Sequence, residues 1–260
     1  MEASIHKAYV REAPQAKTAV LFIHGIFGSP NHFADFVKRV PEQISVYNIL
    51  LDGHGGTVRA FRESSASLWE KTVLSTLDRL SARYENIVIA AHSLGALLAI
   101  NASHRFADKI RLLFLIAVPL KIAVKPAAML TSLKVVRNRI GPGDKAALAA
   151  KAASSIAPAE KLYEYAACAP RFLELFREAR RARGAVSALL PETVAFQSGK
   201  DELVSLKSCA YLQKNPRIQV RLMKKSMHYY YDEAEFSAML EHFSALLLPF
   251  CATDEGGNKP

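Results

Sequence analysis

The stretch Ile87-Val88-Ile89-Ala90-Ala91-His92-Ser93-Leu94-Gly95-Ala96-Leu97-Leu98 decides how the rest of the chain is interpreted. A β-branched run ends at Ala91 and an apolar helical pattern begins at Leu94, which predicts a strand, a sharp turn and a helix. A small-x-Ser-x-Gly turn in that context is typical of a nucleophile elbow, which holds a serine hydroxyl above the end of a sheet. Strand and helix pass close together there, so small residues such as Ala91 and Gly95 are needed.

The chain on either side of this elbow alternates apolar runs with amphipathic helical patterns. The alternation predicts a mostly parallel sheet covered by helices on both faces, with functional loops at the carboxyl ends of the strands. The expected strands cover residues 18–23, 45–51, 87–91, 110–117, 193–197 and, near an edge, 218–223. Residues 5–10 are a further candidate for an edge strand.

The segment from Pro119 to Leu190 interrupts this alternation with about seventy residues of helical composition. Its expected helices run over 126–140, 144–155, 158–168 and 171–183. We therefore predict a core of residues 1–118 and 191–251, a helical cap insertion of residues 119–190 above the strand ends, and a flexible tail of residues 252–260.

Positive charge is concentrated in the insertion. The chain has a formal net charge of +10, and residues 119–190 contain 13 Lys or Arg against 5 Asp or Glu. A solvated helical surface is the favoured interpretation, and the alternative is a face that meets an anionic substrate or lipid. No recognised nucleic-acid-binding motif accompanies the charge, so no nucleic-acid partner is expected.

One helical face of the insertion carries an apolar stripe, interleaved with cations. The favoured interpretation is that the stripe packs on the core, and the alternative is a lid with weak contact with an anionic membrane surface. The stripe consists of Met129, Leu133, Val136 and Ile140, and the interleaved cations are Lys134, Arg137 and Arg139.

The remaining composition predicts a cytoplasmic protein. The longest apolar run, Leu112 to Leu120, has nine residues and a proline, too short to cross a bilayer. The first seven residues lack the features of a signal peptide. The three cysteines are widely spaced, which predicts reduced thiols, and no histidine and carboxylate cluster has metal-ligand spacing, so neither metal nor cofactor is expected.

A serine nucleophile needs a base and an acid that orients the base, and in a fold of this type they follow the serine in the order acid, then histidine. His228 lies in the loop after the last strand and is the candidate base, whereas His242 lies within a helical pattern. Asp201 follows the preceding strand and is the candidate acid, with the adjacent Glu202 as the fallback. Asp201 could instead cap the helix that follows it.

Two backbone N–H groups are expected to stabilise the oxyanion: that of Leu94, after the nucleophile, and that of Ile26, after the first main strand. His24 and His54 also lie in glycine-containing loops at this end of the sheet. Both precede Ser93, so we expect them to brace loops, and we expect His92 to be structural.

With these residues in place, the chain resembles the α/β-hydrolase superfamily, and within it bacterial carboxylesterases and monoacylglycerol lipases with a small helical cap. The resemblance implies the α/β-hydrolase fold, a serine-esterase mechanism, the triad Ser93, Asp201 and His228, and Ile26 and Leu94 as oxyanion donors. It departs from the usual pattern at Ala91, where glycine is common. The matching segments are His24-Gly25-Ile26-Phe27-Gly28, Gly53-His54-Gly55, Ala91-His92-Ser93-Leu94-Gly95, Lys200-Asp201-Glu202-Leu203-Val204 and Met227-His228.

The expected function is cleavage of small-molecule carboxylic esters, such as acyl glycerols or short- to medium-chain acyl esters, through an acyl-enzyme. An acyltransferase or thioesterase with the same triad, a peptidase and a carbon–carbon hydrolase remain open, as does a non-catalytic binding protein on this fold. The sequence leaves the acyl chain, the head group and the oligomeric state open.

Overall fold

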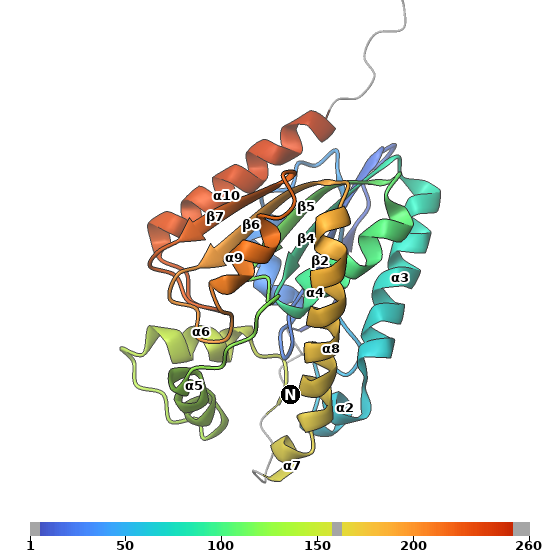
Figure 1. Ribbon diagram of the computed structural model, residues 1–260. Coiled ribbons are helices and arrows are strands. Elements are labelled where there is room, and N and C mark those ends of the chain that lie inside the picture. Colours follow the sequence, from blue (N-terminus) through green and yellow to red (C-terminus); the bar gives the residue numbers. More distant parts are fainter. Residues whose placement is uncertain (1–5, 158–162, 252–260) are drawn as a thin grey trace, which may run out of the picture.

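A seven-stranded sheet forms the centre of the molecule, as the computed structural model of residues 6–157 and 163–251 shows (Figure 1). Its order is β1-β3-β2-β4-β5-β6-β7; β1 pairs antiparallel with β3, and all other pairs are parallel. The α/β fold predicted from the sequence is therefore confirmed. The strands are β1 Tyr9–Arg11, β2 Thr18–Ile23, β3 Ser45–Ile49, β4 Asn86–His92, β5 Ile110–Ile116, β6 Glu192–Ser198 and β7 Ile218–Met223.

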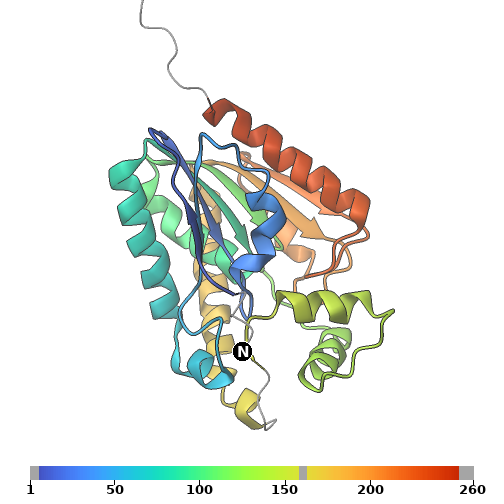
Figure 2. The same ribbon diagram turned by 180° about the vertical axis from the view of Figure 1, so that it is seen from behind.

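Helices cover both faces of this sheet because successive side chains of each buried strand point to opposite sides. In β2, Leu21 and Ile23 join one apolar cluster, and Val20 and Phe22 join the other. The first cluster includes α3 (Ala66–Arg83), α4 (Leu94–Ser103), α8 (Ala169–Ala185) and α9 (Lys207–Leu212). The second includes α1 (Ala34–Val37) and α10 (Glu233–Leu247), which lie on the face turned toward the viewer in Figure 2.

Two short helical segments precede α3 in the chain. Residues 30–37 form a 3-10 turn, Pro30–Phe33, followed by the single turn of α1, and Pro41 disfavours helical geometry at the residue before it. A further short helix, α2 (Val58–Glu63), follows the glycine loop after β3, where Thr57 caps it by accepting the N–H of Ala60. The candidate edge strand over 5–10 is β1, at the edge of the sheet as expected but shifted toward Arg11.

The insertion divides into two parts with different packing. Its first two helices, α5 (Pro126–Val136) and α6 (Lys145–Ala153), lie beyond the carboxyl ends of β6 and β7 in both views (Figures 1 and 2). The long α8 instead packs along α3 and α4 and buries Leu175, Ala179 and Ala182 in the core. The third expected helix, 158–168, begins in residues 158–162, which lie outside the described part of the chain; α7 (Tyr163–Ala166) is what the structure describes of it. The proposed tail of residues 252–260 also lies outside the described residues.

Within residues 6–157 and 163–251, no helix is both long enough and apolar enough to cross a bilayer.

Candidate functional site

Ser93 occupies the apex of the predicted elbow, between β4 and α4. Its backbone is in a strained conformation, with φ 52° and ψ −117°, and its N–H donates to the carbonyl of Ile116 at 2.9 Å. A Cβ at Gly95 would lie 2.1 Å from the carbonyl oxygen of Ile23, so only glycine fits there. Ala91 is fully buried and accommodated. The sequence-based prediction of a strand–turn–helix elbow at Ser93 is confirmed.

Asp201 and His228 are paired at the same edge of the sheet. The Nδ1–H of His228 donates to Oδ2 of Asp201 at 2.9 Å, and both side chains are almost completely buried. The other carboxylate oxygen, Oδ1, accepts the N–H groups of Leu203 and Val204, each at 2.8 Å. These bonds fix the orientation of the Asp201 carboxylate toward His228. Asp201 does not cap α9.

The pair shifts both pKa values in the direction that favours the ion pair. Burial opposes charge on Asp201, but the adjacent His228 and the two backbone N–H donors lower the pKa of its carboxyl below the ordinary value. Burial likewise opposes charge on His228, but the Asp201 carboxylate and their hydrogen bond raise the pKa of the imidazole above its ordinary 6.5. A buried imidazole with this partner can accept a proton and be stabilised as imidazolium.

Glu202, the fallback acid, has a different role. Its carboxylate accepts the backbone N–H of His228 at 3.2 Å and is itself buried. Asp201 thus orients the imidazole ring, and Glu202 holds the main chain of the same residue. The adjacent positions of the two carboxylates in the sequence do not reveal these separate roles, which follow from the geometry of the loop.

The two N–H groups expected to bind an oxyanion are available. Within the described residues, neither the N–H of Ile26 nor that of Leu94 has a hydrogen-bond acceptor. The loop of Ile26 is a tight turn, closed by the N–H of Gly28 donating to Gly25 at 3.0 Å, with Phe27 at φ 58°. The hydroxyl of Tyr229 donates to the carbonyl of Ile26 at 3.2 Å and links this loop to the loop of His228.

His24 and His54 brace loops, as predicted from their positions. Nδ1–H of His24 donates to Gly25 at 2.8 Å, and its Nε2 accepts the N–H of Leu51 at 3.1 Å. This pattern requires a neutral ring, in agreement with the pKa of His24, which burial lowers well below its ordinary value. His54 is hydrogen-bonded to the carbonyl of Asp52, and burial lowers its pKa to about 4.

His92 is structural, as expected, but sequence reasoning missed what it supports. Its Nε2–H donates to the carbonyl of His228 at 3.2 Å, and its ring stacks on His32 at 4.1 Å between centroids. Burial lowers the pKa of His92 well below its ordinary value, and burial lowers that of His32 to about 3, so both rings are neutral. His92, the residue immediately before Ser93, therefore connects the elbow to the loop of His228.

The insertion is tied to two loops of this site, which no motif in the sequence indicates. At one end, the N–H of Lys125 donates to the carbonyl of Glu202 at 2.8 Å, and its Nζ donates to that of Asp201 at 2.5 Å. At the other end, the buried Ser155 donates its hydroxyl to the carbonyl of Gly28 at 2.6 Å and accepts the N–H of Gly55 at 3.1 Å. The α5 and α6 pair is thus anchored to the loop of Asp201 and Glu202 at one end and to the loop of Ile26 at the other.

The structure does not join Ser93 to His228 by a hydrogen bond. Nε2 of His228 is buried and has no hydrogen-bond partner among the described residues, and Ser93 is 4% exposed. The unpartnered nitrogen is the one that a base would use, since Nδ1 is held by Asp201. In unliganded enzymes such contacts are often long and tighten only when substrate binds.

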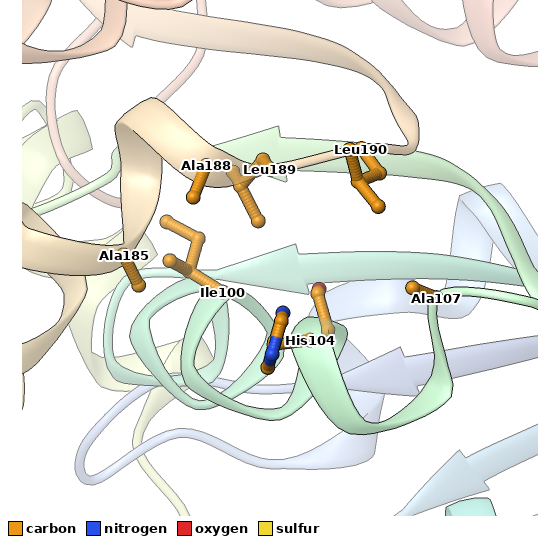
Figure 3. A pocket seen from close by; sticks show the side chains of 8 residues that line it. Ile100, His104, Ala107, Ala185, Ala188, Leu189 and Leu190 are labelled. Atoms are coloured by element: carbon orange, nitrogen blue, oxygen red, sulfur yellow. The ribbon is translucent and has the colours of Figure 1, made fainter.

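A cavity of about 320 Å³ lies elsewhere, beginning two turns along α4 from Ser93 and continuing to the end of α8 (Figure 3). It contains no acid, lysine or arginine, and the hydroxyl of Ser103 is committed to the carbonyl of Ala99. His104 is the one titratable side chain of its lining, so the cavity does not bring a nucleophile, a base and an acid together. The lining residues are Ile100, Ser103, His104, Ala107, Ala185, Ala188, Leu189 and Leu190.

Comparison with known proteins adds a family match and a set of similar folds. The sequence profile described as the Alpha/beta hydrolase family matches residues 20–239. No curated protein matches the chain.

Several solved structures share the fold at low sequence identity. A structure of the metagenome-derived lipolytic enzymes LipS and LipT has a TM-score of 0.72 and 16% identity, covering 94% of this chain and 98% of that one. The monoacylglycerol lipase of Paleococcus ferrophilus has a TM-score of 0.64 and 17% identity, covering 92% and 99%. Est1E of Butyrivibrio proteoclasticus, with bound ferulic acid, has a TM-score of 0.59 and 17% identity, covering 95% and 96%.

Proposed function

Because the chain belongs to the alpha/beta hydrolase family, we propose that it is a serine hydrolase that cleaves small-molecule carboxylic esters through Ser93, His228 and Asp201. The observation that carries the proposal is the buried Asp201–His228 pair with a free Nε2, at the sheet edge where Ser93 stands in an elbow. The names of the similar structures, which include lipolytic enzymes and a monoacylglycerol lipase, support an acyl ester or acyl glycerol as the substrate class.

The proposed reaction has two acyl-transfer steps. His228 accepts the Ser93 hydroxyl proton at Nε2 as the oxygen attacks the ester carbonyl, and Asp201 stabilises the imidazolium while staying ionised. The N–H groups of Ile26 and Leu94 bind the oxyanion; loss of one such donor typically costs about 3 kcal/mol in the barrier. The alcohol leaves with the proton from His228, and water repeats the sequence on the acyl-enzyme.

This chemistry uses side chains and backbone alone, so the proposal includes no cofactor and no metal. We also propose a cytoplasmic location, which the free thiols of Cys168, Cys209 and Cys251 support. Cell fractionation with tagged protein tests the location, and recovery from an extracytoplasmic fraction would contradict it.

The experiment that tests the function compares Ser93→Ala with Ser103→Ala on a nitrophenyl ester of short acyl chain. Ser103 is a matched control, since it is a buried serine at the other end of α4 whose hydroxyl bonds only to the carbonyl of Ala99. We expect Ser93→Ala to lose turnover by at least about 10⁴-fold and Ser103→Ala to keep it. Retained turnover in Ser93→Ala would exclude the proposed nucleophile.

A further inference from the structure

The helix pair α5–α6 (126–153) presents an unpartnered apolar face to solvent. We call Met129, Leu130 and Leu133 of α5, together with Arg137 at its C-terminal cap, the outer face; their spacing places them together on one side of the helix. Met129, Leu130 and Leu133 are 67%, 61% and 40% exposed. The expectation that the stripe packs on the core is wrong for Met129 and Leu133, whereas its other two members, Val136 and Ile140, are half-buried. The inner side of α5 includes the buried Ala128.

The segment that carries this apolar face is rich in positive charge. Residues 121–153 contain seven Lys or Arg and a single acid, Asp144. Asp144 is already engaged, since its carboxylate accepts Lys134 at 2.6 Å and caps α6 at the N–H of Ala147. Arg137 and Arg139 are exposed and form no ion pair among the described residues. The hairpin formed by α5 and α6 therefore combines an excess of positive charge with exposed apolar side chains on α5.

We propose that the outer face and its flanking cations dock the protein onto an anionic lipid bilayer. Apolar side chains that insert at the headgroup boundary and cations that meet lipid phosphates and carboxylates are the two components of interfacial binding. A nucleic-acid surface would use the charge but would leave Met129, Leu130 and Leu133 in water. Exposed apolar side chains next to cations therefore favour a lipid bilayer over a nucleic acid as the partner.

The position of the hairpin gives docking a defined geometry. In Figures 1 and 2, α5 lies farther from the sheet than α6, beyond the carboxyl edge. The hairpin is fixed at its ends to the loops of Asp201 and Gly28 through Lys125 and Ser155. A docked outer face therefore holds this edge of the sheet toward the bilayer. The inference does not depend on the proposed esterase activity.

The test is co-sedimentation of the full chain with vesicles of phosphatidylcholine alone and vesicles that also contain phosphatidylserine, at low and high salt. We expect binding only to the vesicles with phosphatidylserine and release at high salt, since charges on a surface are screened within roughly 3 Å at about 1 M salt. Arg137→Gln with Arg139→Gln should weaken partitioning about 25-fold, at about fivefold for each cation. Met129→Ser with Leu130→Ser and Leu133→Ser should weaken it by at least about tenfold.

The control is Lys71→Gln with Arg79→Gln on α3, which removes the same net charge from a different surface of the molecule; it should bind vesicles as the parent does. The unfolding midpoint of every variant shows that it is folded. Binding that ignores anionic lipid and salt would overturn the proposal, as would equal weakening by the α3 control. If the apolar triple variant still bound vesicles, insertion into lipid would be excluded and the surface would be a general polyanion site. If the parent were a dimer and the triple variant were not, the outer face would be an interface between two copies of the chain.

Discussion

Replacing Asp201 with Asn probes the proposed charge arrangement without changing the size of the side chain. Oδ1 of Asp201 accepts the N–H groups of Leu203 and Val204, so the Asn oxygen would remain there and its NH₂ would face His228. Nδ1 would then have to accept a hydrogen bond, which moves the ring proton to Nε2. That tautomer cannot take the proton of Ser93.

The expected loss in kcat is about 10⁴-fold, the size known for a wrong tautomer in a serine triad. It corresponds to about 5.4 kcal/mol in the activation barrier. Steady-state turnover of a nitrophenyl ester measures it, and KM should change little because Asp201 lies behind His228. Asp108→Asn makes the same chemical change in an exposed residue at the amino end of β5 and should leave kcat unchanged.

The pH profile gives an independent test of the same pair. Only neutral His228 can act as a base, so kcat/KM should rise with pH through the pKa of the free enzyme. Asp201 raises the pKa of His228 above 6.5, so the rise should be centred above pH 6.5 in the parent. In Asp201→Asn, the carboxylate that raises the pKa of His228 is gone, while burial still lowers that pKa, so the midpoint should move to lower pH. A loss under tenfold together with an unmoved midpoint would refute the assigned role of Asp201.

Three further substitutions test the supports of the site. Gly95→Ala should destabilise the fold by about 3 kcal/mol in chemical denaturation, because its Cβ would lie 2.1 Å from a carbonyl oxygen of β2. Gly184→Ala in α8 is the control and should not destabilise the fold, since its new Cβ would meet no atom within 4 Å. Equal effects of the two substitutions would contradict this reasoning. Ser155→Ala removes two hydrogen bonds to the glycine loops, and we expect a loss of about 1–2 kcal/mol in unfolding free energy and a lower kcat; unchanged stability would show that the contact is dispensable. Glu202→Ala should lower kcat/KM about tenfold, because the backbone N–H of His228 loses its acceptor. Glu202→Gln keeps an acceptor and should retain most of the activity. An equal loss in both variants would indicate that the charge of Glu202 matters more than the hydrogen bond.

The strands and the elbow could be predicted from the sequence because their patterns are local. A strand buried on both faces is a continuous apolar run, as in β2 and β4, and the turn at Ser93 requires a small residue at position 95. The loops of Asp201 and His228 follow from the same rule, since parallel strands end at one edge of the sheet. The Asp201–His228 hydrogen bond then confirmed that these two loops meet.

The supports of the site could not be predicted, because they join segments far apart in the chain. Ser155 reaches Gly28 and His92 reaches the carbonyl of His228 through side chains whose types have many other uses. Helical periodicity also leaves open which side of a helix is covered: it placed Met129 and Leu133 on one face of α5 but gave no measure of the neighbouring structure. The helix α8 of the same insertion is also rich in Ala and Arg, yet it packs along α3 and α4.

Covalent labelling identifies the nucleophile itself, which we propose is Ser93. The parent protein is treated with a fluorophosphonate, digested and mapped by mass spectrometry, with Ser93→Ala and Ser103→Ala treated in parallel. We expect one phosphonyl group on the peptide that contains Ser93, in the parent and in Ser103→Ala, and none in Ser93→Ala. Absence of labelling in the folded parent, or labelling that persists at another residue when Ser93 is replaced, would contradict it.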